Sequence, residues 1–114
     1  MTQTITIKYD FIDFNRFIRL NRHERNRETQ TTVDAIAWQC KKLKPVESAH
    51  ITFTWVVKDK MKDKDNLAFA KKFALDGLQR AGVLVNDGWK QVQGFSDDFQ
   101  IADWRGVIVT IREV

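Results

Sequence analysis

Four segments of the chain have the residue pattern of β-strands: residues 4–9, 50–57, 90–95 and 106–112. The first alternates polar and apolar residues with a period of two, which predicts a strand with one buried face. The second places Ile51, Phe53 and Trp55 on one face and is rich in β-branched and aromatic residues. The last two predict a pair of closing strands.

Between these strands, apolar residues recur at helical spacing in two segments. The first covers residues 32–43 and is followed by Pro45, which cannot continue a helix. The second follows Asp65, whose side chain suits an N-cap, and ends at Gly82, a common helix stop. The order β-α-β-α-β-β predicts an α+β domain in which two main helices pack on one mixed β-sheet. No linker or repeat divides the chain, so we expect one domain over residues 1–114.

The size and composition fit one basic domain. The chain has 114 residues, and 19 Lys and Arg against 15 Asp and Glu give a net charge of +4, which weakly favours a polyanionic partner. Cys40 is the only cysteine, so no intramolecular disulfide can form and a reducing compartment is expected. It falls on the apolar stripe of the first helix, which predicts a core residue. No apolar run approaches the ~20 residues needed to cross a bilayer, and the first residues lack the features of a signal peptide.

Three aspartates form the most informative pattern in the sequence. Asp63 and Asp65 stand two residues apart before the second helix, and Asp87 follows that helix. Carboxylate oxygens suit Mg²⁺ or Mn²⁺, provided that the chain after Gly82 folds back beside Asp63. Each aspartate also has an ordinary interpretation, as an N-cap, a turn residue or part of a charged surface loop. Asp97, Asp98 and Asp103 make a second acidic group, which we expect in a solvated turn or near the metal site.

Basic residues gather in two stretches that could contact a phosphate backbone. Five arginines fall between Asn15 and Arg27, and three lysines surround the acidic pair. Arginine presents a fork of donors that matches phosphate oxygens, so the first stretch predicts a DNA-binding arm or, alternatively, a solvated loop. The residues that we expect to contact DNA are Asn15, Arg16, Arg19, Arg22, Arg25, Lys60 and Lys62.

The central motif resembles the RusA-type Holliday junction resolvases. The matching residues are Asp63-Lys64-Asp65-Asn66-Leu67, Asp76-Gly77-Leu78, Ala81-Gly82-Val83 and Asn86-Asp87, with a second patch at Asn15–Arg22. The resemblance extends over roughly residues 4–112, and only the central motif is specific.

The resemblance implies that Asp63, Asp65 and Asp87 bind the metal and that a catalytic lysine lies four residues before the helix aspartate. Counted back from Asp76, that lysine is Lys72. In a continuous helix, seven residues bring Lys72 to within about 20° of the face of Asp65. Three residues more than in the family pattern separate Asp65 from Asp76, so Lys71 remains the alternative. Asn86 replaces the first aspartate of the family's Asp-Asp pair.

The function that this resemblance implies is an Mg²⁺-dependent (or Mn²⁺-dependent) endodeoxyribonuclease that resolves four-way junctions by paired nicks during DNA recombination and repair. It also implies a homodimer in the cytoplasm of a prokaryotic or phage-infected cell. Two symmetric nicks require two active sites, which points to a homodimer independently. Two alternatives stay open: a nuclease of the same fold for flaps or forks, and a catalytically inactive junction-binding protein.

Overall fold

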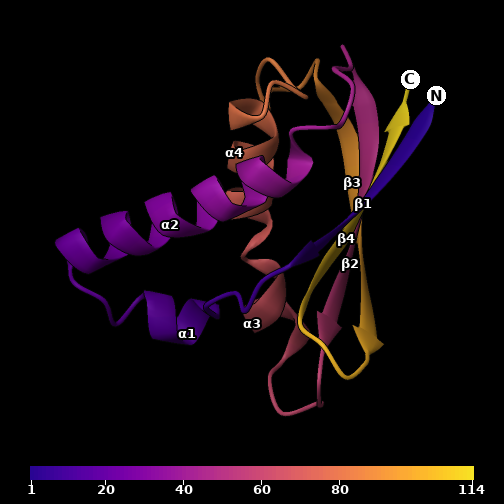
Figure 1. Cartoon of the computed structure of the whole chain (residues 1–114). Helices are drawn as coiled ribbons and strands as arrows, with labels where there is room; N and C mark the ends of the chain where they lie inside the picture. The colour runs from indigo at the N-terminus through magenta and orange to yellow at the C-terminus, as the bar shows by residue number, and fades with distance from the viewer.

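The computed structural model describes all 114 residues as one α+β domain (Figure 1). Four strands and four helices follow in the order β1, α1, α2, β2, α3, α4, β3, β4. Their bounds are Thr2–Lys8 (β1), Phe14–Phe17 (α1), Arg22–Cys40 (α2), Ala49–Val57 (β2), Lys64–Ala68 (α3), Lys71–Arg80 (α4), Val92–Ile101 (β3) and Gly106–Glu113 (β4). None of the helices is long and apolar enough to cross a membrane.

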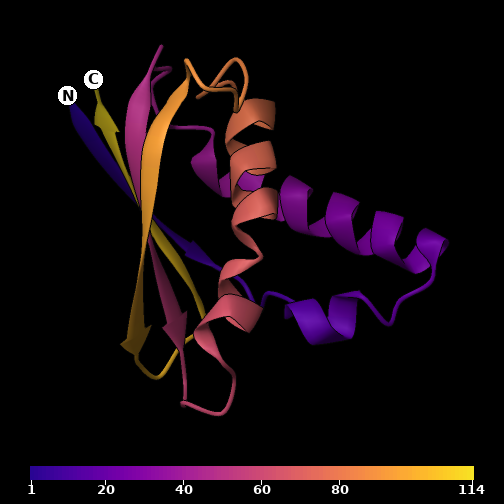
Figure 2. The same ribbon diagram turned by 180° about the vertical axis from the view of Figure 1, so that it is seen from behind.

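The four strands form one mixed sheet in the order β1-β4-β2-β3. β2 and β3 run parallel, whereas β4 pairs antiparallel with both β1 and β2. All the helices lie on one face of this sheet, as the two opposite views show (Figures 1 and 2). The core of 19 buried residues fills the space between the sheet and the two long helices. The predicted α+β class, the mixed sheet and its two main helices are therefore confirmed.

Helix α2 begins ten residues earlier than predicted, at Arg22 instead of Thr32. Asn21 and Glu24 form a capping box, in which each side chain accepts from the other residue's backbone N–H, and this box starts the helix. Residues 21–27 are all exposed, and the buried residues of α2 lie only in its second half. The first half of α2 and the short α1 thus form an arm, residues 14–31, that projects from the sheet (Figure 1).

The predicted helix over residues 65–82 is divided in two. A tight turn at Phe69 and Ala70 separates α3 from α4, and the ring of Phe69 packs on Phe14 and Phe17 of α1. The N-cap position of α3 is Asp63, so the prediction that Asp65 is the N-cap is wrong. Gly82 ends the segment as predicted, with a φ of 79° that favours glycine.

Helix α4 crosses α2 very closely at Gly77. A Cβ atom at this position would overlap Cγ2 and Cβ of Ile36, so no larger residue fits there unless the helices shift. The absence of a side chain therefore sets the spacing of the two main helices and fixes α4 above the sheet.

Strand β3 is longer than the predicted strand at residues 90–95. It pairs with β2 from Val92 to Ile101, and this pairing includes Asp97 and Asp98. The expectation that these two residues occupy a turn is wrong. Nine parallel residue pairings with the largely buried strand β2 outweigh the low β-propensity of aspartate.

Candidate functional site

Asp63 and Asp65 stand at the start of α3, and Figure 1 shows this short helix beside the end of β2. Both are exposed, and neither carboxylate forms an ion pair or a hydrogen bond within the chain. Asp63 in particular makes no side-chain cap bond, although it occupies the N-cap position. Two carboxylates are thus free to bind a cation or a solvent molecule at this point.

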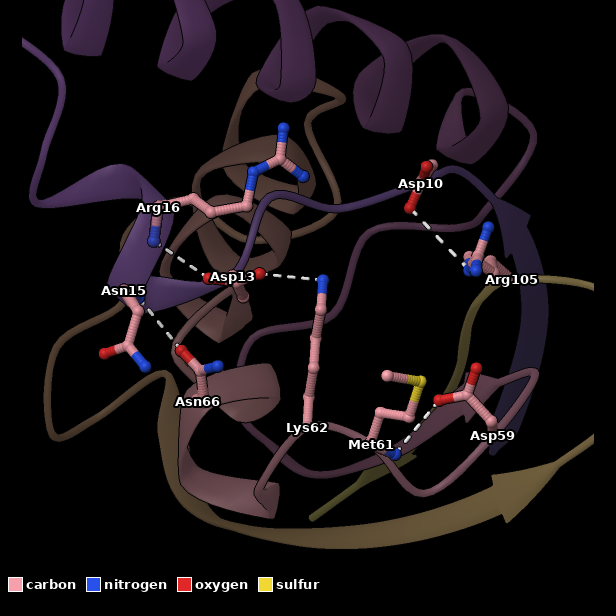
Figure 3. A network of polar contacts seen from close by, with 9 residues as sticks. All are labelled: Asp10, Asp13, Asn15, Arg16, Asp59, Met61, Lys62, Asn66 and Arg105. Carbon is pink, nitrogen blue, oxygen red and sulfur yellow. Dashed lines mark hydrogen bonds and ion pairs between the residues drawn. The ribbon is translucent and has the colours of Figure 1, made fainter.

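Contacts to α1 and to its N-cap residue hold the start of α3 in place. Oδ1 of Asn66 accepts from the backbone N–H of Asn15 at 2.9 Å, and Lys62 Nζ lies 2.7 Å from Oδ2 of Asp13 (Figure 3). Asp13 is 4 % exposed, and its other oxygen caps α1 by accepting from the backbone N–H of Arg16. The arm and the free carboxylates therefore lie side by side.

The ion pair with Lys62 changes the acidity of Asp13. Burial by itself would raise the pKa of this carboxyl group, but the hydrogen bonds from Lys62 and the Arg16 backbone, together with the positive charges of both residues, lower the pKa below its ordinary value. Asp13 is therefore ionised at neutral pH and holds the Lys62 side chain in one position. Asp13 was not predicted from the sequence, although an aspartate directly before the start of a helix is a recognisable N-cap.

Asp87 lies in the loop after α4, close to Lys72. Its Oδ2 atom is 3.8 Å from Lys72 Nζ, and the same ammonium group is 3.4 Å from Oδ1 of Asp76. Lys72 is 68 % exposed. Oδ1 of Asn86 accepts from the backbone N–H of Asp87, so the asparagine shapes this turn.

The three aspartates of the motif do not meet within one chain. The loop that carries Asp87 leads to Val92, which pairs with Ala49 at the start of β2, whereas Asp63 follows the end of that strand. Asp87 folds back from that loop as far as Lys72, the second residue of α4. The three carboxylates nevertheless form no group that could hold a metal ion together, so the expectation that Asp87 joins Asp63 and Asp65 is not met within the chain.

The division of the helix also changes the position of Lys72. The angle of about 20° between Asp65 and Lys72 holds only for a continuous helix, and the turn at Phe69 and Ala70 interrupts it. Lys72 contacts Asp76 and Asp87 instead.

Lys71, the alternative lysine, is engaged in a partly buried network that the sequence did not reveal. Its Nζ atom lies 2.6 Å from Oδ2 of Asp97, and Oδ1 of the same carboxylate accepts from Nε1 of Trp55 at 2.9 Å. The ammonium group also lies 4.1 Å from the centre of the Phe95 ring. Lys71 thus fastens α4 to β3. Asp97 could be placed here only by knowing how far β3 extends, and the local residue pattern does not reveal that length.

The candidate DNA-contacting residues fall into two groups. Exposed side chains without an ion pair belong to Asn15, Arg16, Arg19, Arg22 and Lys60. Two others have structural contacts: the guanidinium of Arg25 donates to the carbonyl of Ile18 and lies over the Phe17 ring, and Lys62 is paired with Asp13. Arg27, the fifth arginine, is also exposed.

Cys40 takes no part in this site. It is fully buried in the core, as predicted, and burial raises the pKa of its thiol to about 11. The thiolate needed for nucleophilic chemistry is therefore scarce at neutral pH.

The carboxylates of the motif fit a metal ion only in part. No group of three or more His, Cys, Asp or Glu side chains is arranged to hold one within the chain. The exposed pair Asp63 and Asp65 nevertheless provides the one or two carboxylates with which proteins usually hold Mg²⁺, the remaining positions being filled by water and substrate oxygens. The pair fits Mg²⁺, and the set of three does not.

The fold and the site define a class: a small α+β domain with two free carboxylates at a helix start and an arginine-bearing helical arm beside them. The chain matches no protein-family model and no curated protein.

Proposed function

We propose that the protein is a metal-dependent endodeoxyribonuclease that resolves Holliday junctions by paired symmetric nicks during DNA recombination and repair. The observation that carries this proposal is the free, exposed carboxylate pair of Asp63 and Asp65, positioned next to the basic arm. The resemblance of residues 63–87 to the RusA-type resolvases supports it from the sequence.

The distribution of charge supports a DNA substrate. Residues 15–27 carry five arginines and one glutamate, so this segment accounts for the whole net charge of +4 and the rest of the chain is neutral. Arg16, Arg19 and Arg22 are exposed and free of carboxylate partners, so they can donate to phosphate oxygens. The arm binds the DNA backbone and brings a phosphodiester to the start of α3.

Asp63 and Asp65 would hold Mg²⁺, or Mn²⁺ in its place, and the ion would there supply a water of lowered pKa and polarise a phosphoryl oxygen. Lys62, held by Asp13, orients the neighbouring phosphate, and Lys72 donates to the charge that develops on the phosphate oxygens in the transition state.

A homodimer completes this proposal. Paired nicks on opposite strands need two sites related by a two-fold axis. Lys72, which follows Asp65 by seven residues, and its partner Asp87 belong to the same chain as the carboxylate pair, so the second copy supplies a second site for the second nick. Light scattering of the protein in solution tests for the dimer mass.

The experiment that tests the function compares the wild type with Asp65→Asn on a synthetic four-way junction, a replication fork and a linear duplex in Mg²⁺. We expect symmetric nicks in the junction and a loss of rate of at least about 100-fold in the variant, because one of the two metal-holding carboxylates loses its charge. Junction binding in the absence of Mg²⁺ should remain.

Asp98→Asn is the matched control, since it removes an exposed aspartate of β3 that has no partner, and it should cut at the wild-type rate. Equal cleavage by the wild type and Asp65→Asn would refute the site. Preferential cleavage of forks would favour a nuclease for other branched DNA, and junction binding without cleavage at any Mg²⁺ or Mn²⁺ concentration would indicate an inactive binding protein.

A further inference from the structure

A cavity of about 320 Å³ lies at the carboxyl end of β2, beside the candidate site. Its walls come from four segments: residues 9–12 before α1, residues 55–59, 61 and 62 at the end of β2 and after it, Leu67 of α3, and residues 105–106 at the start of β4. Its volume is at the lower end of the range for small-molecule sites, about 300–1,000 Å³, so it suits one small ligand.

Three aromatic side chains line the inner part of this cavity. The ring of Phe11 lies 5.2 Å from that of Tyr9 and meets Trp55 edge-on at 5.9 Å. Trp55 is fixed by its bond to Asp97, and the hydroxyl of Tyr9 accepts from Thr32 of α2. Rigid aromatic rings that are held from behind provide a surface on which a planar heterocycle can pack.

Five charged side chains line the cavity, and Figure 3 shows four of them: Lys62, the Asp10–Arg105 pair and Asp59. Asp10 lies 4.0 Å from Arg105, Lys62 is paired with Asp13, and Asp59 accepts from the backbone N–H of Met61, which leaves its negative charge in place. Lys58 is the one cation of the lining that forms no ion pair. It is therefore the lining side chain that can bind an anionic group of the ligand.

The position of the cavity connects it to the metal-binding pair. Lys62 and Leu67 both line it, and Asp63 and Asp65 stand between them in the chain. A ligand in the cavity thus lies next to the phosphodiester that would be held at the start of α3.

We propose that this cavity binds one unpaired nucleotide of the DNA, its base packed against Phe11 and its phosphate paired with Lys58. The proposal rests on the proposed function, since the nucleotide belongs to the substrate. It adds that the protein draws a base out of the stack next to the cleavage point, where a four-way junction has its weakest stacking.

The test measures how strongly the protein binds junctions in which one nucleotide near the branch point lacks its base. The measurements are made without Mg²⁺, so that binding is separated from cleavage. At one of the tested positions, removal of the base should raise the Kd of the wild-type protein for the junction about ten-fold. This is the effect of losing one base–aromatic contact. A single-stranded oligonucleotide with one central abasic nucleotide provides the same comparison without any branch.

Two pairs of variants identify the cavity as the source of this effect. Phe11→Leu should abolish the ten-fold ratio between intact and abasic DNA, whereas Phe14→Leu, which changes an exposed phenylalanine outside the cavity, should preserve it. Lys58→Glu should likewise reduce the ratio towards one. Lys60→Glu makes the same charge change two residues away, outside the lining, so it should weaken binding of both DNAs equally. Thermal melting shows which variants are folded, and the Lys58 pair suffices if Phe11→Leu is not.

The proposal is overturned if no position gives a ratio above two with either DNA, or if Phe11→Leu and Lys58→Glu leave the ratio unchanged. Adding Mg²⁺ to the same samples tests the proposed function separately. If the single strand shows a base-dependent ratio that needs Phe11 and Lys58 while no branched DNA is cut, the nuclease proposal fails and the nucleotide cavity stands.

Discussion

Lys71 and Lys72 are neighbours at the start of α4, yet their surroundings differ in every respect. The side chain of Lys71 is 17 % exposed, is bound to Asp97 and lies against the Phe95 ring. The side chain of Lys72 is 68 % exposed and lies near Asp76 and Asp87 at the longer distances of 3.4 and 3.8 Å. One residue of helical rotation separates a lysine that faces the sheet from a lysine that faces solvent.

This difference assigns the two lysines to different tasks. A lysine whose ammonium group is bound to a partly buried carboxylate and lies over aromatic rings stabilises the fold, and moving it would leave Asp97 without its cation. A solvent-exposed lysine with weak, screened partners can exchange them for a phosphate at little cost. The proposed catalytic role therefore falls on Lys72.

The largest expected effect comes from Lys72→Ala in the junction-cleavage assay. The cleavage rate should fall by about 100-fold or more, because a positive charge that stabilises the transition state is lost. Junction affinity should fall only slightly, and the free energy of unfolding should change by no more than about 0.5 kcal/mol, as for other exposed residues. Rate, affinity and denaturant unfolding are measured on the same preparation.

The assignment of the catalytic role to Lys72 is refuted if Lys71→Ala loses junction cleavage while it remains fully folded. Lys71 would then be the catalytic residue, and its bond to Asp97 would have to open when DNA binds. A junction-cleavage rate that neither substitution changes would remove both lysines from the reaction.

A stability effect of intermediate size is expected for Lys71→Met. Methionine keeps most of the packing volume but leaves the Asp97 carboxylate, 23 % exposed, with only the Trp55 N–H as a partner. We expect a loss of about 2 kcal/mol in the free energy of unfolding, the usual cost of an unpaired, partly buried charge. Urea unfolding at neutral pH measures it.

Lys72→Met is the matched control for this substitution, since the same side-chain change one residue away should cost no more than about 0.5 kcal/mol. Equal losses at the two positions would show that their different exposure has no energetic consequence.

The sequence predicted the fold class because alternation in residues 4–9 and 50–57 and the helical spacing of apolar residues are local signals. It misplaced Lys72 because the turn at Phe69 depends on packing against Phe14 and Phe17, residues more than fifty positions earlier. It missed Asp97 because β3 is extended by its parallel pairing with β2, another non-local cause. The free carboxylates of Asp63 and Asp65 could be selected from the motif, but the distance to Asp87 could not.

Lys62 and Asp13 form a third lysine–carboxylate pair. It differs from the other two because its acid is buried, whereas its lysine is 44 % exposed. Asp13→Asn keeps an oxygen that can accept from the Arg16 backbone, and Lys62 can return to water. We therefore expect a loss of only about 1 kcal/mol at pH 7, measured by urea unfolding.

The pH dependence of this loss has a definite sign. The pKa of Asp13 is lowered in the folded protein, so its ionised form contributes stability above the unfolded pKa of about 3.9, and the contribution disappears as the pH falls through the lowered folded pKa. The difference between the wild type and Asp13→Asn should be constant from about pH 8 to 5 and shrink below about pH 4. Lys62→Met removes a hydrogen bond and a positive charge that lower the pKa of Asp13, so the carboxyl group of this variant should take up its proton at a higher pH than in the wild type. The stability deficit of Lys62→Met at pH 7 should therefore also shrink as the pH falls. A deficit that does not change with pH would show that the ion pair does not determine the acidity of Asp13.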